Sequence, residues 1–163
     1  MKTISRFFLF TVLLFSSAAL PAQNYQNAIG LRGGWYDGIT FRHMLSESTA
    51  LEGLFMSRWR GWDITCLYEF QKPLKEDGFD WYYGGGAHIG GYNPHYYYQD
   101  LNTHYYDQGY DMAVGVDGII GMEYTFKEIP LNLGIDIHPL LDVSGGKLWF
   151  WYDAAFSVRF VLD

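Results

Sequence analysis

Apolar and polar residues alternate along most of this chain with a period of two. In the last segment, Tyr152, Ala154, Phe156, Val158, Phe160 and Leu162 alternate with Asp153, Ala155, Ser157, Arg159 and Val161. Successive side chains of a β-strand point to opposite faces, so this period predicts strands with one apolar face and one face that accepts charge. The spacing of three and four that marks an amphipathic helix does not recur after about position 28. We therefore expect an all-β domain.

The alternating segments number about eight, and turn-forming residues separate them as in antiparallel hairpins. We expect strands near 28–36, 39–45, 50–58, 62–71, 79–92, 111–126 and 131–139, followed by a Gly-rich loop at 143–147 and a final strand. Asp37-Gly38 has the composition of a two-residue hairpin turn. Pro139 is expected to end the seventh strand or to lie at a bulge, because proline cannot donate to the ladder. One long connection, 92–109, is polar and rich in Tyr and His.

Such strands in an exported chain are typical of a closed antiparallel up-and-down transmembrane β-barrel of about eight strands. A soluble barrel would carry Lys and Glu on its outer face, whereas here one face holds nearly all of the Ile, Leu, Val, Phe and Trp. An eight-stranded barrel is just wide enough to be filled by side chains, and Gly residues leave room for long ones. We expect this interior polar network: Arg32, Arg42, Glu52, Asp63, Glu69, His88, Asp117, Glu123, Asp136 and Arg159.

The first 22 residues have the three parts of a secretory signal peptide. Lys2 and Arg6 precede an apolar core at 7–15, and small residues follow as far as Ala22. This core is shorter than the roughly 20 residues that a membrane-spanning helix needs. We expect a signal peptide at 1–22, a single β-barrel domain at 23–163 and localisation in the outer membrane.

Charge and composition narrow the classes of function. The chain has 11 Lys and Arg against 18 Asp and Glu, and this acidic balance argues against a nucleic-acid partner. Cys66 is the single cysteine, so no intrachain disulfide can form. Aromatic residues make up 20% of the chain and there are 19 Gly, which suits a barrel with aromatic girdles and closely packed strands.

Two groups of residues have the types needed for catalysis. His88, facing inward beside Asp80 and Tyr82, has the chemistry of a general base, but no nucleophile is identifiable near it. A second group contains the residue types of a lipid-A deacylase of barrel form: His43, Ser46, Ser48 and Glu52. Alternation places His43 on the lipid-facing side and Glu52 inside, so these residues are not expected to converge. An interior hydrogen-bonded His88 and an ordinary turn at 46–48 are the simpler interpretations.

The long connection has two kinds of candidate contact. Imidazole and carboxylate side chains suit a metal, although His95, Asp100, His104 and Asp107 lack the tight spacing of a metal site. Tyr-rich loops provide rigid amphipathic contact area, so a surface protein or glycan is a candidate partner. The candidate contact residues are Tyr96, Tyr97, Tyr98, His104, Tyr105 and Tyr106. An aromatic girdle at the headgroup level explains several of these tyrosines equally well.

Several segments together resemble a family of small outer-membrane β-barrel proteins of the Bacteroidota. These segments are AIGLRGG at 28–34, ALEG at 50–53, TCLYE at 65–69, WYYGGGAH at 81–88, GVDGIIGMEYTF at 115–126 and PLN at 130–132. The resemblance covers nearly the whole mature chain and implies a barrel with its inner charges rather than a reaction. His138 stands where the family suggests Lys, and the chain ends in Val161-Leu162-Asp163 instead of an aromatic residue, which leaves Phe160 as the terminal aromatic.

We predict an integral outer-membrane β-barrel that has a structural or surface-interaction role, is filled by side chains and is not an enzyme. Its expected partner is outer-membrane lipid, and no cofactor is expected. Two alternatives stay open: a lipid-modifying outer-membrane enzyme, and a narrow channel or small-solute binder that uses the acidic lumen.

Overall fold

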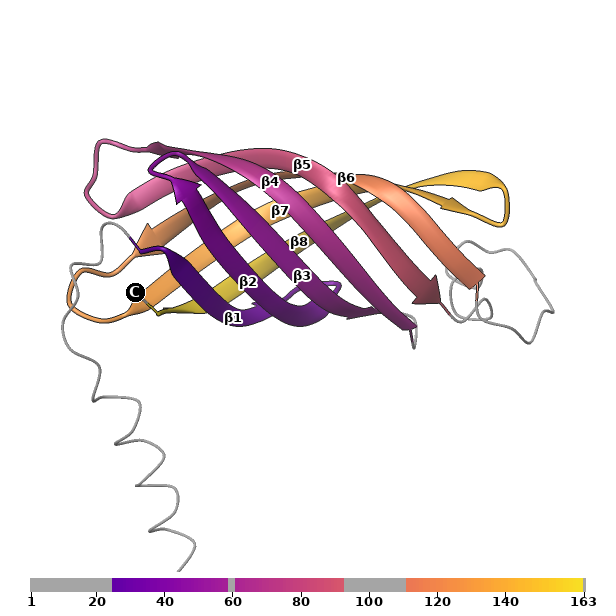
Figure 1. Cartoon of the computed structure of the whole chain (residues 1–163), viewed down its shortest axis with the longest axis horizontal. Coiled ribbons are helices and arrows are strands. Elements are labelled where there is room, and N and C mark those ends of the chain that lie inside the picture. The colour runs from indigo at the N-terminus through magenta and orange to yellow at the C-terminus, as the bar shows by residue number, and fades with distance from the viewer. Residues whose placement is uncertain (1–24, 59–60, 93–110, 163) are drawn as a thin grey trace, which may run out of the picture.

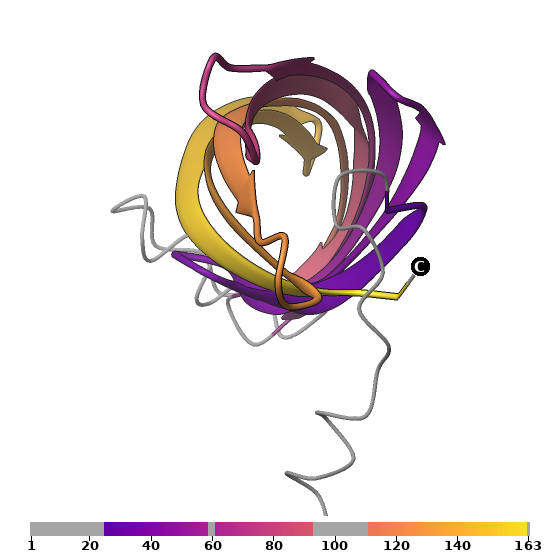
Figure 2. The ribbon, with the colours of Figure 1, turned by 90° about the vertical axis from the view of Figure 1, so that its left-hand side faces the viewer.

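The chain forms one closed ring of eight antiparallel strands (Figures 1 and 2). The computed structural model describes residues 25–58, 61–92 and 111–162. The strands are β1 (Asn27–Gly33), β2 (Asp37–Ser46), β3 (Thr49–Arg58), β4 (Gly61–Pro73), β5 (Phe79–Tyr92), β6 (Asp111–Thr125), β7 (Leu131–Ser144) and β8 (Lys147–Val161). Each strand pairs with the next, and β8 pairs with β1, so the ring has no unpaired edge. The predicted all-β, closed up-and-down barrel of about eight strands is confirmed.

The two ends of the barrel differ in what they carry (Figure 1). At the end that we call the turn end, the first and last described residues lie beside the connections 47–48, 74–78 and 126–130. The opposite end, which we call the loop end, carries the turns 34–36 and 145–146. Residues 59–60 and 93–110, which connect strands at the loop end, lie outside the described residues.

Exposed and buried side chains alternate along the strands, but the exposed ones are apolar and the buried ones are charged. This is the opposite of a folded protein in water. Apolar side chains point outward: Leu31 is 69% exposed and Val116 is 58% exposed. Charged side chains point inward, and Arg42, Glu52 and Arg159 have no exposed surface at all. The period of two that predicted the strands therefore also assigns each residue to the inside or the outside of the ring.

The expected hairpin between β1 and β2 forms, but the predicted position of its turn at Asp37-Gly38 is wrong. Both residues belong to β2, where Asp37 pairs with Ser57 and Gly38 with Met56, and the turn is formed by residues 34–36. Gly38 lies so close to β3 that an added Cβ would be 2.2 Å from the carbonyl oxygen of Phe55. Gly38 is thus required by the close packing of β2 against β3, and it resembled a turn residue only in composition.

The predicted end of the seventh strand at Pro139 is also wrong. β7 continues through Pro139 to Ser144, and Pro139 pairs with Tyr152 of β8. On its other side the ladder with β6 is interrupted near Pro139 and resumes in the same register, so no bulge is present there. The loop expected at 143–147 is reduced to Gly145-Gly146, both with positive φ, which is the conformation that favours glycine in a tight turn.

The barrel interior as candidate functional site

All ten side chains that were expected to form the interior network are buried inside the ring. They do not form one network. Five of them make an Arg–Glu cluster towards the turn end: Arg42, Glu52, Glu69, Glu123 and Arg159. Arg32 pairs with Asp136 in a second group, and His88 and Asp117 belong to a third group towards the loop end, with Asp63 nearby.

The Arg–Glu cluster is built around two guanidinium groups. Arg42 donates to Glu52 at 2.6 Å and forms an ion pair with Glu123, and its Nη2 lies 2.8 Å from Oε2 of Glu69. Arg159 donates to the other oxygen of Glu52 at 2.7 Å. Since an isolated buried charge is costly, each guanidinium depends on these carboxylates for its place in the interior.

Neutral side chains complete the hydrogen bonding of this cluster. Arg159 also donates to Thr40 at 3.2 Å and to Asn132 at 3.1 Å. Glu123 accepts from Gln71 at 3.0 Å and from Tyr25 at 3.2 Å. The alternation placed Thr40, Gln71 and Asn132 on the inner face, whereas Tyr25 precedes β1 and no strand pattern in the sequence indicated it.

Arg32 connects β1 to the last two strands of the chain, which lie beside it in the closed ring. It forms an ion pair with Asp136 of β7, and its Nη2 donates to Asp153 of β8 at 3.2 Å. Asp153, which the sequence analysis did not include in the network, also accepts from the backbone N–H of Trp35 at 2.9 Å and so holds the 34–36 turn. Tyr82 donates to Asp136 at 3.3 Å and lies under the Arg42 guanidinium, 4.5 Å from it. This tyrosine links the Arg32 group to the Arg–Glu cluster.

A His–Asp cluster occupies the loop-end half of the interior: Asp63, His88, Asp117, His138 and Asp142. Nδ1 of His88 lies 2.9 Å from Asp117, and Nε2 lies 2.8 Å from a carboxylate oxygen of Asp142 as a close ion-pair contact. Nε2 of His138 lies 2.9 Å from the second oxygen of Asp117. Asp117 therefore bridges two imidazoles, and His88 stands between two carboxylates.

The partners of His88 differ from those expected. Asp80 and Tyr82 share its face of β5 but lie six to eight residues away, which is roughly 20–26 Å along an extended strand. His138 and Asp142 are both buried but were not among the expected network residues. The alternation had placed His138 on the inner face, whereas Asp142 lies beyond Pro139, where the seventh strand was expected to end. Continuing the alternation through Pro139 would have placed Asp142 inside as well.

Glycines on the inner face leave room for the largest interior side chains. A Cβ on Gly115 would lie 2.3 Å from Cε1 of His88, and one on Gly121 would lie 2.5 Å from the Tyr82 ring. A Cβ on Gly134 would lie 2.9 Å from Nη1 of Arg159. The three glycines thus set the positions of interior side chains that belong to other strands.

An apolar group lies between the two charged clusters on one side of the lumen. On β4, Leu67 lies between Glu69 and Asp63, and on β6, Ile119 lies between Glu123 and Asp117. Both are at least 96% buried and pack in one group with these residues: Tyr36, Leu54, Met56, Tyr82 and Leu140. Side chains therefore fill the middle of the lumen: apolar ones from β3 to β7, and the ion-paired Arg32, Asp136 and Asp153 from β1, β7 and β8.

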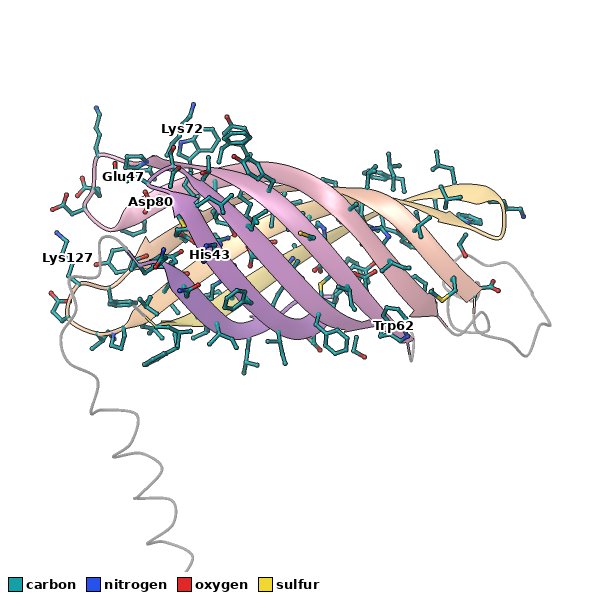
Figure 3. The ribbon with its side chains drawn as sticks, viewed as in Figure 1. His43, Glu47, Trp62, Lys72, Asp80 and Lys127 are labelled. Atoms are coloured by element: carbon teal, nitrogen blue, oxygen red, sulfur yellow. The ribbon has the colours of Figure 1, made fainter. Side chains whose placement is uncertain are left out.

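A cavity of about 630 Å³ opens at the turn end of the barrel. Gln71 and Tyr25 line it and also donate to Glu123, so it lies directly beside the Arg–Glu cluster. The carboxylates of Glu47 and Asp80 border it as well (Figure 3). This cavity is open from outside the ring.

The residue types of a lipid-A deacylase do not come together. His43 contacts Asn27 at 2.8 Å, and the Ser46 hydroxyl lies 2.7 Å from that of Thr49. Glu52 instead belongs to the Arg–Glu cluster inside the ring. Ser48 contributes its backbone N–H to the Ser46 hydroxyl at 3.3 Å, as in an ordinary turn.

The expected contact residues of the long connection lie outside the described residues: Tyr96, Tyr97, Tyr98, His104, Tyr105 and Tyr106. The metal-ligand candidates His95, Asp100 and Asp107 lie outside them too. Among the described residues, no group of three or more His, Cys, Asp or Glu has the arrangement of a metal site. The part of the chain that the structure describes contains no helix long and apolar enough to cross a membrane.

Comparison with known proteins supports the fold. No protein-family model matches the chain. No curated protein matches it in sequence either. Among solved structures, the chain is similar to the N-terminal β-barrel domain of Pseudomonas aeruginosa OprF, with a TM-score of 0.64 and 15% sequence identity over 83% of this chain and 96% of that chain. At this identity the likeness shows a shared barrel fold, and the expected relationship to a Bacteroidota family receives no support from these comparisons.

Proposed function

We propose that this protein is an integral outer-membrane β-barrel with a structural or surface-interaction role. The observation that carries the proposal is the outer face of the ring, where large apolar side chains are exposed on all eight strands, among them Ile29, Phe41, Phe55 and Ile135. In water such a surface would associate with itself, whereas in a bilayer it is the surface that contacts lipid. Closure satisfies every strand edge, as a bilayer requires.

Aromatic residues on the outer face support a membrane-spanning band. Near the turn end, Phe70 stacks on Tyr83 with ring centroids 5.5 Å apart. Near the loop end, Trp35 meets Tyr152 edge to face at 6.2 Å, and Trp62 lies close to that end (Figure 3). Aromatic girdles at both membrane interfaces are typical of outer-membrane barrels. The strands β2 to β8 have 10 to 15 residues, which is long enough to cross a bilayer when tilted.

The filled interior favours a structural role over transport. The apolar group around Leu67 and Ile119 fills part of the lumen between the Arg–Glu and His–Asp clusters, and the ion-paired Arg32, Asp136 and Asp153 fill the rest. We propose that the protein does not act as a general porin, and that it is not an enzyme, because the catalytic residue types around His43 and Glu52 are apart. Interaction with a surface protein or glycan would then depend on residues 93–110. Membership in the Bacteroidota family remains part of this proposal, on the segments that resemble it.

The first test is membrane fractionation followed by gel electrophoresis with and without boiling. We expect the protein in the outer-membrane fraction, with a folded band that migrates differently after heating because a closed barrel resists detergent until heated. Recovery in the soluble periplasmic fraction would overturn the proposal. Deleting residues 96–106 should keep the heat-modifiable band and abolish surface binding, whereas binding that survives the deletion would exclude the long connection as the contact site.

A further inference from the structure

A ladder of aromatic rings with one lysine lies on the outer face of β4 and β5 near the turn end (Figure 3). In the strand register Phe70 is directly opposite Tyr83, and Lys72 is directly opposite Trp81. Trp81 stacks on Tyr83 at 5.2 Å, Tyr83 stacks on Phe70 at 5.5 Å, and Phe70 meets Tyr68 edge to face at 5.2 Å. The rings form a continuous platform that runs from the lysine towards the middle of the barrel.

The Lys72 ammonium lies over this platform. Nζ is 5.6 Å from the centroid of the Trp81 ring and 5.9 Å from that of Tyr83, within range for a cation–π interaction with both. Lys72 is exposed, and none of the ion pairs found among the described residues involves it. The ammonium is therefore positioned by ring faces, while its N–H donors stay available for an anion.

Lys72 is unusual among the basic residues of the strands. Arg32, Arg42 and Arg159 are buried and paired, and of the strand lysines and arginines with described side chains only Lys72 and Lys147 are exposed. These two lie at opposite ends of the barrel. Lys72 precedes the last residue of β4, so it stands at the edge of the apolar band, and Tyr68 lies roughly 10 Å deeper for a strand tilted by about 40°.

We propose that Lys72, Trp81 and Tyr83 form a binding site for the headgroup phosphate of an anionic phospholipid at the turn end. This inference rests on the proposed function, since it needs the outer face to contact a bilayer. The ammonium binds the phosphate, the two stacked rings occupy the headgroup level, and Phe70 and Tyr68 contact the start of the acyl chains.

Two features favour a lipid over free phosphate as the ligand: the platform is continuous with the apolar outer face of the barrel, and the chain has a negative net charge. The platform merges with the apolar outer face of the barrel, where Phe70 is 42% exposed and the neighbouring Ile120 of β6 is 51% exposed. A free phosphate ion would gain nothing from this surface, whereas a phospholipid uses both the cation and the apolar surface beside it. The chain is acidic, with a formal net charge of −7, so general electrostatic attraction of anions to it is weak.

The test is a lipid titration of the folded, detergent-solubilised barrel, followed by native mass spectrometry. Phosphatidylglycerol is the probe, phosphatidylcholine the neutral comparison and inorganic phosphate the competitor. We expect Lys72→Gln to weaken phosphatidylglycerol binding about fivefold, the factor that corresponds to one interfacial lysine. Trp81→Leu should weaken it about two- to fivefold through loss of the cation–π face. Lys72→Arg should keep it.

Two lysines serve as matched controls. Lys75→Gln removes the same charge three residues further along, in the 74–78 turn, and Lys147→Gln removes it at the loop end. Both should bind phosphatidylglycerol as the parent protein does. Equal affinity in the parent and in Lys72→Gln, or an equal loss in Lys75→Gln, would overturn the site, and displacement of the lipid by millimolar inorganic phosphate would overturn its assignment to a lipid.

Each variant is first inserted into phosphatidylcholine vesicles and examined for the heat-modifiable band. Failure of the parent protein to give this band would contradict the proposed membrane barrel itself. A normal band with unchanged lipid affinities would contradict only the phospholipid site, so the two proposals fail separately.

Discussion

The two charged clusters of the lumen are built in different ways. The Arg–Glu cluster draws its residues from β2, β3, β4, β6 and β8, so its ion pairs reach across the ring. Arg42 and Glu123 are 81 positions apart in sequence. The His–Asp cluster draws only on the neighbouring strands β4 to β7, which are already held together by long ladders.

This difference indicates separate roles. β1 is the shortest strand, with 7 residues, and the ring closes through its pairing with β8. Arg159 of β8 and Arg42 of β2 anchor this part of the ring to β3 and β6, and Arg32 of β1 joins it to β7 and β8 beside it. Arginine stays charged at every accessible pH, so these ion pairs persist. We infer that the Arg–Glu cluster stabilises the closure of the ring. The His–Asp cluster adds only modestly to the stability of strands β4 to β7, which their ladders already hold together.

The largest expected effect comes from removing Glu52, the carboxylate that accepts close hydrogen bonds from both arginines. Glu52→Leu leaves Arg42 and Arg159 short of a partner in a buried site, and we expect a loss of about 3–5 kcal/mol in the free energy of unfolding. Urea titration of the heat-modifiable band measures it. Glu52→Gln keeps the shape of the side chain and should lose less.

The control for this prediction is Glu76→Gln, which removes an exposed carboxylate from the 74–78 turn. Its urea midpoint should equal that of the parent protein. A Glu52→Leu barrel as stable as its parent would refute the role of the Arg–Glu cluster in closure.

A smaller loss is expected from crowding the His–Asp cluster without changing its charge. A Cβ on Gly115 would lie 2.3 Å from the His88 ring and 2.2 Å from the backbone oxygen of Leu141, so Gly115→Ala should destabilise the barrel by about 1–3 kcal/mol. Gly134→Ala meets the movable end of Arg159 at 2.9 Å and should cost less. Gly53→Ala is the control, since nothing lies closer than 4.0 Å to its added Cβ. Equal urea midpoints for Gly115→Ala and Gly53→Ala would exclude a tight fit around His88.

Replacing His88 itself should have a modest effect. His88→Gln can still donate to one carboxylate, and Asp117 keeps His138, so we expect a loss of about 1 kcal/mol, well below that of Glu52→Leu. The matched control is His43→Gln, which alters a histidine outside the clusters. If His88→Gln were as damaging as Glu52→Leu, the proposed division between a cluster that stabilises closure and one that adds only modestly to stability would be wrong.

The alternation of the sequence predicted the direction of each side chain but not its partner. Direction follows from the backbone, because a strand has a period of two, and this period placed Arg42 and Glu123 inside without any knowledge of the fold. Partners depend on how the ring closes, so the sequence associated His88 with Asp80 on its own strand rather than with Asp142 two strands away. The turn predicted at Asp37-Gly38 was wrong for a similar reason. Gly38 is needed for close packing against β3, a contact that depends on how the strands pair.

The smallest effect is expected for an ion pair outside the lumen. Nζ of Lys127 lies 2.8 Å from Oδ2 of Asp77, a distance like those inside the ring, but the two side chains are 44% and 78% exposed. The Lys127 ammonium lowers the pKa of Asp77. A lowered carboxylate pKa contributes stability above the unfolded value, near 3.9, and loses it as the pH falls through the folded pKa. Because water screens exposed pairs, Asp77→Asn should leave the urea midpoint unchanged between pH 5 and pH 8. A clear shift in that range would mean that distance, rather than burial, determines how much an ion pair stabilises this barrel, and that the buried ion pairs of the lumen do not differ in kind from exposed ones.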